Sequence, residues 1–200
     1  MNNALEDIVD AYLRRIEKCK LVERNVFITG GELDAIGIDP DKKRIIMCEA
    51  TASGNAYGAE CVSRLTAKFA RAEDYVRENL SWLGFPKIEG QFWAPYISKE
   101  QRTGIAQCAA LKNVRVIDAY EYFQRTAKLR EALRGADQKT LNPTCQLIAL
   151  EQELKIKMKN RLTHVKSSGG SLKKPDPSAS SVVAPIKMNI SAGNGGGFAA

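Results

Sequence analysis

The hydrophobic positions in the first part of the chain recur first at helical spacing and then at strand spacing. A helix is predicted over residues 4–20, and a short strand over 26–29, before the glycine pair Gly30-Gly31. The apolar stripe of this helix is expected to pack on a sheet. Its members are Leu5, Ile8, Val9, Tyr12, Leu13 and Ile16.

Residues 31–51 have the pattern of a β-hairpin, with a Pro-Asp-Lys-Lys turn between two apolar strands. The period of two places Glu32 and Asp34 on one face of the first strand, together with its isoleucines. On the second strand it places Glu49 and Thr51 on a common face. The opposite faces are apolar as well, and a strand that is apolar on both faces is usually covered on both, as in an α/β sheet.

The remainder of the chain alternates helix and strand, and this order predicts a right-handed crossover with some parallel pairing. Composition then changes near residue 167 to Ser, Gly, Pro and Ala without periodicity, which is typical of disorder. We expect an α/β domain over 1–135, a helical appendage over 136–166 and a disordered tail over 167–200. The predicted elements after the hairpin are helices over 59–80, 99–111, 120–133 and 142–162 and strands over 87–94 and 114–117.

Charge and composition narrow the classes of protein to consider. Lys and Arg number 30 against 23 Asp and Glu, a net charge of +7, which favours polyanionic partners such as nucleic acid. The five cysteines are scattered without zinc-ligand spacing, and the single histidine, His164, excludes catalysis by a histidine pair. The first residues are acidic and lack a basic region and an apolar core, so we expect no secretory signal, and no apolar run reaches membrane length. We therefore expect a cytoplasmic protein with no membrane partner.

Asp34 and Glu49 are the first candidates for chemistry. The hairpin would bring these two carboxylates together at the ends of adjacent strands, and hard oxygen ligands of this kind suit Mg²⁺ or Mn²⁺. Such a metal can polarise a phosphoryl oxygen and activate water. Taken singly, each residue also fits an ordinary solvated carboxylate at a strand end, so both interpretations stay open.

The order helix, three strands, helix and strand, with Asp on the second strand and Glu on the third, resembles the PD-(D/E)XK, or restriction-endonuclease-like, superfamily. The resemblance covers roughly residues 4–118. It rests on the segments Gly31-Glu32-Leu33-Asp34-Ala35-Ile36 and Ile45-Ile46-Met47-Cys48-Glu49-Ala50-Thr51. It implies an αβββαβ core with a mixed sheet.

The resemblance also implies roles for individual residues. Asp34 would be the shared metal ligand, Glu49 the second carboxylate, and the backbone carbonyl of Ala50 a further ligand. Glu6 would be an auxiliary acidic residue, as in archaeal junction-resolving nucleases, and it also fits a solvated helix charge. Glu32 lies two residues before Asp34 and has no assigned role.

This chain departs from the family pattern at Thr51, where the family carries lysine. A threonine hydroxyl cannot supply a positive charge to a phosphate under attack. In some relatives the lysine lies on the helix after the third strand, and Lys68 occupies such a helix, flanked on its stripe by Arg64 and Arg71. Lys68 would restore catalysis if that helix packs across the carboxylates. Otherwise the site has lost activity.

The sequence therefore predicts a Mg²⁺-dependent endonuclease that hydrolyses DNA phosphodiester bonds, with RNA not excluded as a substrate. Arg64, Arg71, Lys155 and Lys159 are expected to contact phosphates. A homodimer is a further expectation, because cutting both strands of a duplex usually requires two active sites. A catalytically inactive nucleic-acid-binding module and a protein-interaction component are the alternatives.

One aromatic segment adds a further candidate. Residues 91–96, Gln-Phe-Trp-Ala-Pro-Tyr, place three aromatic rings within six positions. Aromatic side chains can stack on nucleic-acid bases, but in a domain of this size they also serve as core or rim packing. The sequence leaves both interpretations open.

Overall fold

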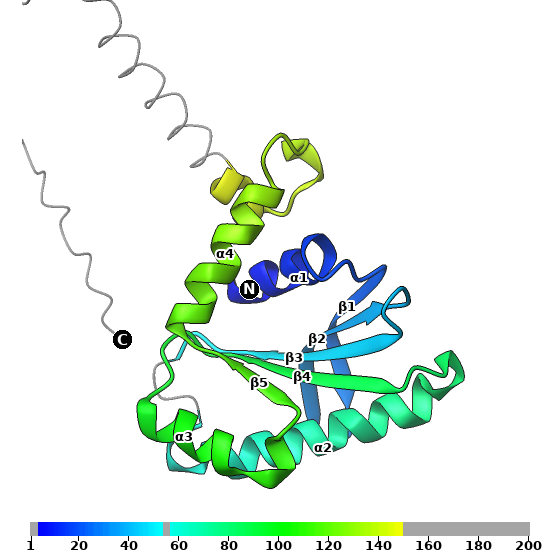
Figure 1. Ribbon diagram of the computed structural model, residues 1–200, viewed down its shortest axis with the longest axis vertical. Coiled ribbons are helices and arrows are strands. Elements are labelled where there is room, and N and C mark those ends of the chain that lie inside the picture. The colour runs from blue at the N-terminus through cyan, green and yellow to red at the C-terminus, as the bar shows by residue number, and fades with distance from the viewer. Residues whose placement is uncertain (1–3, 54–56, 150–200) are drawn as a thin grey trace, which may run out of the picture. The chain divides into compact units, whose positions relative to one another are not determined.

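The computed structural model of this protein describes residues 4–53 and 57–149. Within these ranges the predicted α/β architecture is confirmed as one five-stranded mixed sheet with helices on both faces (Figure 1). The helices are α1 (Ala4–Arg15), α2 (Cys61–Asn79), α3 (Lys99–Gln107) and α4 (Ala119–Ala132). The strands are β1 (Leu21–Ile28), β2 (Gly31–Asp39), β3 (Arg44–Ala50), β4 (Lys87–Trp93) and β5 (Val114–Ile117).

The strands lie in chain order across the sheet, β1-β2-β3-β4-β5. The first three form an antiparallel meander, whereas β3, β4 and β5 are parallel, as the alternation of helix and strand predicts. In the parallel part, Ala50 pairs with Trp93 and Trp93 with Ile117. The carboxyl ends of β3, β4 and β5 therefore share one edge of the sheet, which we call the carboxyl edge.

Two apolar clusters cover the two faces of the sheet. Helices α1 and α4 pack on one face around Leu13, Ile46 and Trp93, and α2 and α3 pack on the other around Leu65 and Phe92 (Figure 1). Burial of each such side chain contributes about 1.5–3 kcal/mol relative to exposure. The sheet is apolar on both faces, as the sequence indicates, and this property requires a layer of helices on each side.

The period-two pattern of β2 breaks near Asp34, contrary to the prediction that Glu32 shares a face with Ile36 and Ile38. Leu33 lies in the same buried cluster as Ile36 and Ile38, so Glu32 cannot continue their face. On the neighbouring strand β1, Asn25 lies opposite Asp34, between two paired positions on either side, and has a φ of 53°. Left-handed backbone in a strand increases local twist, and we attribute the change of face to it.

The first helix and the first strand also differ from their predicted bounds. Helix α1 ends at Arg15, five residues early, and Lys18 then adopts a left-handed φ of 63° that turns the chain. Strand β1 begins at Leu21 because its backbone pairs with β2 over its whole length. The polar residues in the middle of this strand, Glu23, Arg24 and Asn25, interrupt the local strand signal, so tertiary pairing decides its bounds.

The described part of the expected appendage packs into the same core as the α/β domain. Residues 143–149 are helical, and Cys145 and Ala149 are buried in the cluster around α1. Asn142 Nδ2 donates to the backbone carbonyl of Asp7, and Thr144 Oγ1 donates to the Asp7 carboxylate at 2.8 Å. The predicted tail over 167–200 and His164 lie outside the described residues.

Two further observations concern the cysteines and the length of the helices. All five cysteines fall within the described ranges, where each is a free thiol, and four are buried. Across residues 4–53 and 57–149, no helix combines the length and apolar character that crossing a membrane requires.

We predict that Gly90→Ala destabilises the sheet at its contact with α2. A Cβ at Gly90 would lie 2.8 Å from Val114 Cγ2 and 3.0 Å from the Phe69 ring, so β4 and α2 must separate. We expect a loss of about 1–3 kcal/mol in the free energy of unfolding, measured by urea denaturation. Gly31→Ala is the control, because a Cβ there meets nothing within 4 Å. Equal stability of the two variants would contradict the prediction.

Candidate acidic site at the end of strand β3

The hairpin brings Asp34 of β2 next to the last residues of β3. The Ala50 backbone N–H donates to Asp34 Oδ2 at 2.6 Å, and Glu49, the preceding residue, is 4% exposed. The Thr51 N–H donates to the Trp93 carbonyl at 2.8 Å, which ties the end of β3 to β4. The two predicted carboxylates therefore come together at the carboxyl edge, on backbone held by neighbouring strands.

Lys68 reaches this carboxylate pair from α2. Its Nζ lies 2.5 Å from Glu49 Oε2, and the side chains of Lys68 and Glu49 are 19% and 5% exposed. Glu49 Oε2 is buried and makes no hydrogen bond of normal geometry, so the ammonium is its partner through charge. The lysine is held there because the apolar stripe of α2, including Leu65 and Phe69, is buried against the sheet.

Tyr57 completes the surroundings of Glu49, and no sequence pattern indicates it. Its hydroxyl donates to Glu49 Oε1, and its ring stacks on Phe92 with centroids 6.4 Å apart. Tyr57 has a φ of 60°, a left-handed conformation that is uncommon for a residue with a large side chain. Burial and then the charge of Glu49 raise the pKa of the phenol above its usual range, so it stays protonated and donates. No periodicity marks this loop residue.

The pKa of Asp34 is raised by burial and by the nearby second carboxylate. This pKa is raised to about 7. Burial of the side chain is the largest cause, and the charge of Glu49 is the second. The Ala50 N–H and the Lys68 ammonium lower this pKa but do not compensate fully. Near neutral pH, the site therefore exchanges a proton at Asp34, which is typical of functional carboxylates.

Glu6 lies within electrostatic range of the site, on α1. Its charge is a further, smaller cause of the raised pKa of Asp34. Arg24 Nη2 lies 3.4 Å from Glu6 Oε2, and its Nη1 donates to Asp7 at 2.7 Å. Arg24 is thus shared by two acidic residues of α1, and its charge supplies little neutralisation to Asp34.

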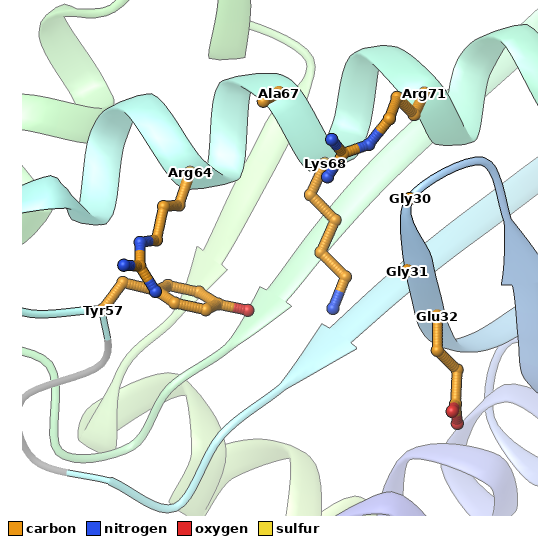
Figure 2. Close-up of a pocket in the computed structure, with 8 residues that line it drawn as sticks. All are labelled: Gly30, Gly31, Glu32, Tyr57, Arg64, Ala67, Lys68 and Arg71. Carbon is orange, nitrogen blue, oxygen red and sulfur yellow. The ribbon is translucent and has the colours of Figure 1, made fainter.

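A basic pocket of about 310 Å³ opens beside the carboxylates, between α2 and the β1–β2 turn. Lys68 and Arg71 extend into it from α2, and Arg64 lies beside the Tyr57 ring (Figure 2). Figure 2 also shows the Glu32 carboxylate pointing away from Arg71, on the side of α1. The eight lining residues are Gly30, Gly31, Glu32, Tyr57, Arg64, Ala67, Lys68 and Arg71.

The two arginines of this pocket differ in their partners. Arg64 pairs with Glu60 at 2.7 Å on the exposed surface of α2. Arg71 forms no ion pair with any described residue, and its Nε is buried without a hydrogen-bond partner. Its guanidinium packs against Gly30, where a Cβ would lie 3.4 Å from Nη1. Arg71 is therefore the pocket cation with its charge available.

The remaining predicted site residues lie apart from this arrangement. The Thr51 hydroxyl accepts from the Ser53 N–H at 3.2 Å, so it takes part in the loop after β3. Lys155 and Lys159 lie outside the described residues. The structure thus brings Asp34, Glu49 and Lys68 together, with Glu6 and Arg71 at the margins.

The donor set of the site consists of hard oxygen atoms. Over the described residues, no group of three or more His, Cys, Asp and Glu side chains is placed to hold a metal ion. The pair Asp34 and Glu49 nevertheless fits Mg²⁺, which is usually held by one or two carboxylates together with water and substrate phosphates. A raised pKa at Asp34 indicates that a second positive charge would be favourable here.

We predict that Asp34→Asn raises stability at pH 8 and has less effect at pH 5, with EDTA present. The pKa of Asp34 is about 7 in the folded protein, against about 4 for an ordinary aspartate. Between these pH values the folded protein keeps a proton on Asp34 that the unfolded chain has lost. The stability of the wild-type protein therefore falls as pH rises from about 4 to 7. The asparagine has no charge to bury, so the free energy of unfolding of Asp34→Asn relative to wild type increases by about 2 kcal/mol over this pH interval.

Urea denaturation of both proteins at pH 5 and pH 8 measures this difference. Asp41→Asn is the matched control, because the Asp41 side chain is 69% exposed and pairs with an exposed lysine. An advantage of Asp34→Asn that is equal at both pH values would show that burial of charge is not its cause.

Comparison with known proteins leaves the geometry as the basis for assigning a function. No protein-family model matches this chain, and no curated protein or solved structure matches it either.

Proposed function

We propose that this protein is a metal-dependent nuclease of the PD-(D/E)XK type that hydrolyses DNA phosphodiester bonds. The observation that carries the proposal is the position of Lys68, whose ammonium lies 2.5 Å from the buried Glu49, beside the half-buried Asp34. The family signature pairs an aspartate and a glutamate with a lysine, and here the lysine comes from α2. The mixed sheet and the order of its elements are compatible with the restriction-endonuclease-like core.

In this proposal Asp34, Glu49 and the backbone carbonyl of Ala50 hold Mg²⁺ or Mn²⁺. The metal supplies Lewis acidity toward a phosphoryl oxygen and increases the acidity of water. Asp34 contributes its full charge once it is deprotonated, and its pKa of about 7 makes occupancy increase from mildly acidic to neutral pH. Glu6 remains an auxiliary acidic residue at the margin, partly neutralised by Arg24.

The side chains around the carboxylates have separate tasks. Lys68 places a positive charge where negative charge develops on the phosphate in the transition state, which is the role that Thr51 cannot perform. Tyr57 donates to Glu49 Oε1 and so fixes the orientation of the carboxylate that holds Lys68. Arg71 would bind a phosphate of the same strand, because its guanidinium is available in the pocket beside Lys68.

One observation favours a second candidate, a nucleic-acid-binding module without catalysis. Thr51 occupies the position of the family lysine, and its hydroxyl accepts from the Ser53 N–H in the loop after β3. A site with this arrangement can retain phosphate binding through Arg71 and Arg64 after loss of cleavage. Salt-dependent DNA binding without cleavage would distinguish this alternative.

We predict that wild-type protein nicks supercoiled plasmid or cuts labelled branched DNA in Mg²⁺ or Mn²⁺ and not in EDTA. Lys68→Met should lower the rate at saturating substrate by at least about 100-fold, because it removes transition-state charge stabilisation. Asp34→Asn and Glu49→Gln should abolish the metal-dependent rate.

Lys112→Met is the matched control, because Lys112 is exposed and lies before β5, away from the carboxyl edge. It should cleave at the wild-type rate. Full activity of Lys68→Met would reject the proposed role of Lys68, and absence of cleavage in wild type under all metals would reject the nuclease.

We predict that Arg71→Ala weakens DNA binding with little effect on the rate at saturating DNA. Loss of one phosphate contact should reduce affinity roughly fivefold to 20-fold at low salt and lower the salt dependence of binding by about one phosphate. Fluorescence anisotropy across a salt titration in EDTA measures both quantities. Arg77→Ala is the control on the same helix, since Arg77 pairs with Glu73 on the exposed face. Equal affinities for the two variants would contradict the prediction.

A further inference from the structure

Three large aromatic side chains are exposed at the carboxyl edge of the sheet. Tyr96 follows β4 and is 67% exposed, while Tyr120 and Phe123 lie in the first turns of α4 and are 71% and 70% exposed. Burying them would be favourable, and the neighbouring Phe92 and Trp93 of the same sequence segment are fully buried. We call Tyr96, Tyr120 and Phe123 the aromatic patch.

The members of the aromatic patch lie close to one another. Tyr120 and Phe123 are three residues apart on α4 and so share a helix face. The Phe123 ring contacts Tyr122 edge to face at 5.9 Å. Pro95 and Ile97, which flank Tyr96 in the chain, line the same pocket as Tyr120. Arg130 is seven residues after Phe123 on α4 and so lies on the same side of that helix. Other exposed aromatic residues, Phe27 and Trp82, lie singly on β1 and after α2.

The surroundings of the aromatic patch are positively charged. A pocket of about 330 Å³ lies between the start of α3 and the start of α4, and Lys99, Arg102 and Tyr120 line it. Its acidic lining residue, Asp118, is paired with Arg102. Among the described residues, Lys99, Glu100 and Arg130 have no ion pair, so the unpaired groups carry a net charge of +1, and Arg130 Nε is buried without a hydrogen-bond partner. The charge at this surface therefore favours a polyanionic partner, such as a nucleic acid, over an apolar one.

The aromatic patch and the acidic site occupy the same edge of the sheet. Strands β3, β4 and β5 are parallel, so Glu49 lies about two strand spacings, about 10 Å, from Val116, the residue in register with it on β5, and Tyr120 follows Val116 by four residues. In Figure 1 the chain enters α3 and α4 from this edge. A nucleic-acid strand crossing it would meet both surfaces within a few nucleotides.

We propose that the aromatic patch is a stacking surface for unpaired bases, so that this protein takes nucleic acid with a single-stranded segment beside the cleaved bond. Bases inside a duplex are stacked on each other and cannot lie on protein rings, whereas unpaired bases can. The substrate class rests on the proposed function, but binding by the patch is measured without cleavage. Lys99 and Arg130 would contact phosphates of the single-stranded segment.

The test uses the full chain in EDTA with a fluorescein-labelled 20-nucleotide oligo(dT) and a duplex of equal length, both followed by anisotropy. The double variant Tyr120→Ser/Phe123→Ser should weaken binding of the single strand at least tenfold and that of the duplex less than twofold. Phe27→Ser/Trp82→Ser, which removes two exposed aromatic residues elsewhere, should bind both probes as wild type does. Tyr120→Phe should keep wild-type affinity, because its ring still stacks.

Several results would overturn the stacking surface. These are equal weakening of both probes, no weakening of either, or no single-strand binding by wild type. Sedimentation would test whether the patch instead binds a second copy of this chain. If the wild-type protein is a dimer and Tyr120→Ser/Phe123→Ser is a monomer with unchanged single-strand affinity, the patch is a dimer contact and the proposal is rejected. Single-strand binding that depends on the patch, without cleavage in any metal, would support the stacking surface and reject only the nuclease.

Discussion

Mutual repulsion between a buried carboxylate, Glu49, and a half-buried one, Asp34, is the constraint that links the sheet of this protein to helix α2. Asp34 and Glu49 meet at the end of β3, and one ammonium, that of Lys68, lies against them. The lysine can reach Glu49 only because α2 packs closely on the sheet, which Gly90 permits by leaving room for Phe69. Apolar packing thus determines where the charge is placed, and the charge in turn makes the end of β3 suited to cations and phosphates.

The two ends of β3 differ in charge balance, and this difference distinguishes a structural network of ion pairs from a candidate functional site. At its amino end, Arg44 is buried and contacts three carboxylates, Asp39 at 3.0 Å, Glu17 at 2.8 Å and Glu89 at 3.3 Å. Burial lowers the pKa of Arg44, but its hydrogen bonds and ion pairs with these carboxylates outweigh burial and raise the pKa further above its usual range, so the group stays charged and paired. At the carboxyl end, neutralisation is incomplete, so a titratable carboxylate remains near neutral pH. Incomplete neutralisation costs stability and is typical of functional sites.

Much of this architecture follows from local sequence pattern. The helices and strands, the hairpin around residues 31–51 and the coverage of both faces were predictable, because side-chain period and turn residues act over a few positions. The meeting of Asp34 and Glu49 was predictable for the same reason, since a tight hairpin fixes which residues of its two strands lie together. The limits of α1 and β1 were not, because backbone pairing with β2 overrides weak local preference.

By itself, then, the sequence determined the α/β class and a candidate carboxylate pair, while tertiary structure decided what surrounds that pair. Three cations share one stripe of α2, and only the packing of the helix places Lys68 on Glu49 and leaves Arg71 without an ion partner among the described residues. Tyr57 joins Glu49 from a loop with no periodic signal. Likewise, Tyr96 is exposed although Phe92 and Trp93, from the same aromatic segment, are buried. These outcomes depend on contacts between residues that are distant in the chain, and such contacts leave no mark on local spacing.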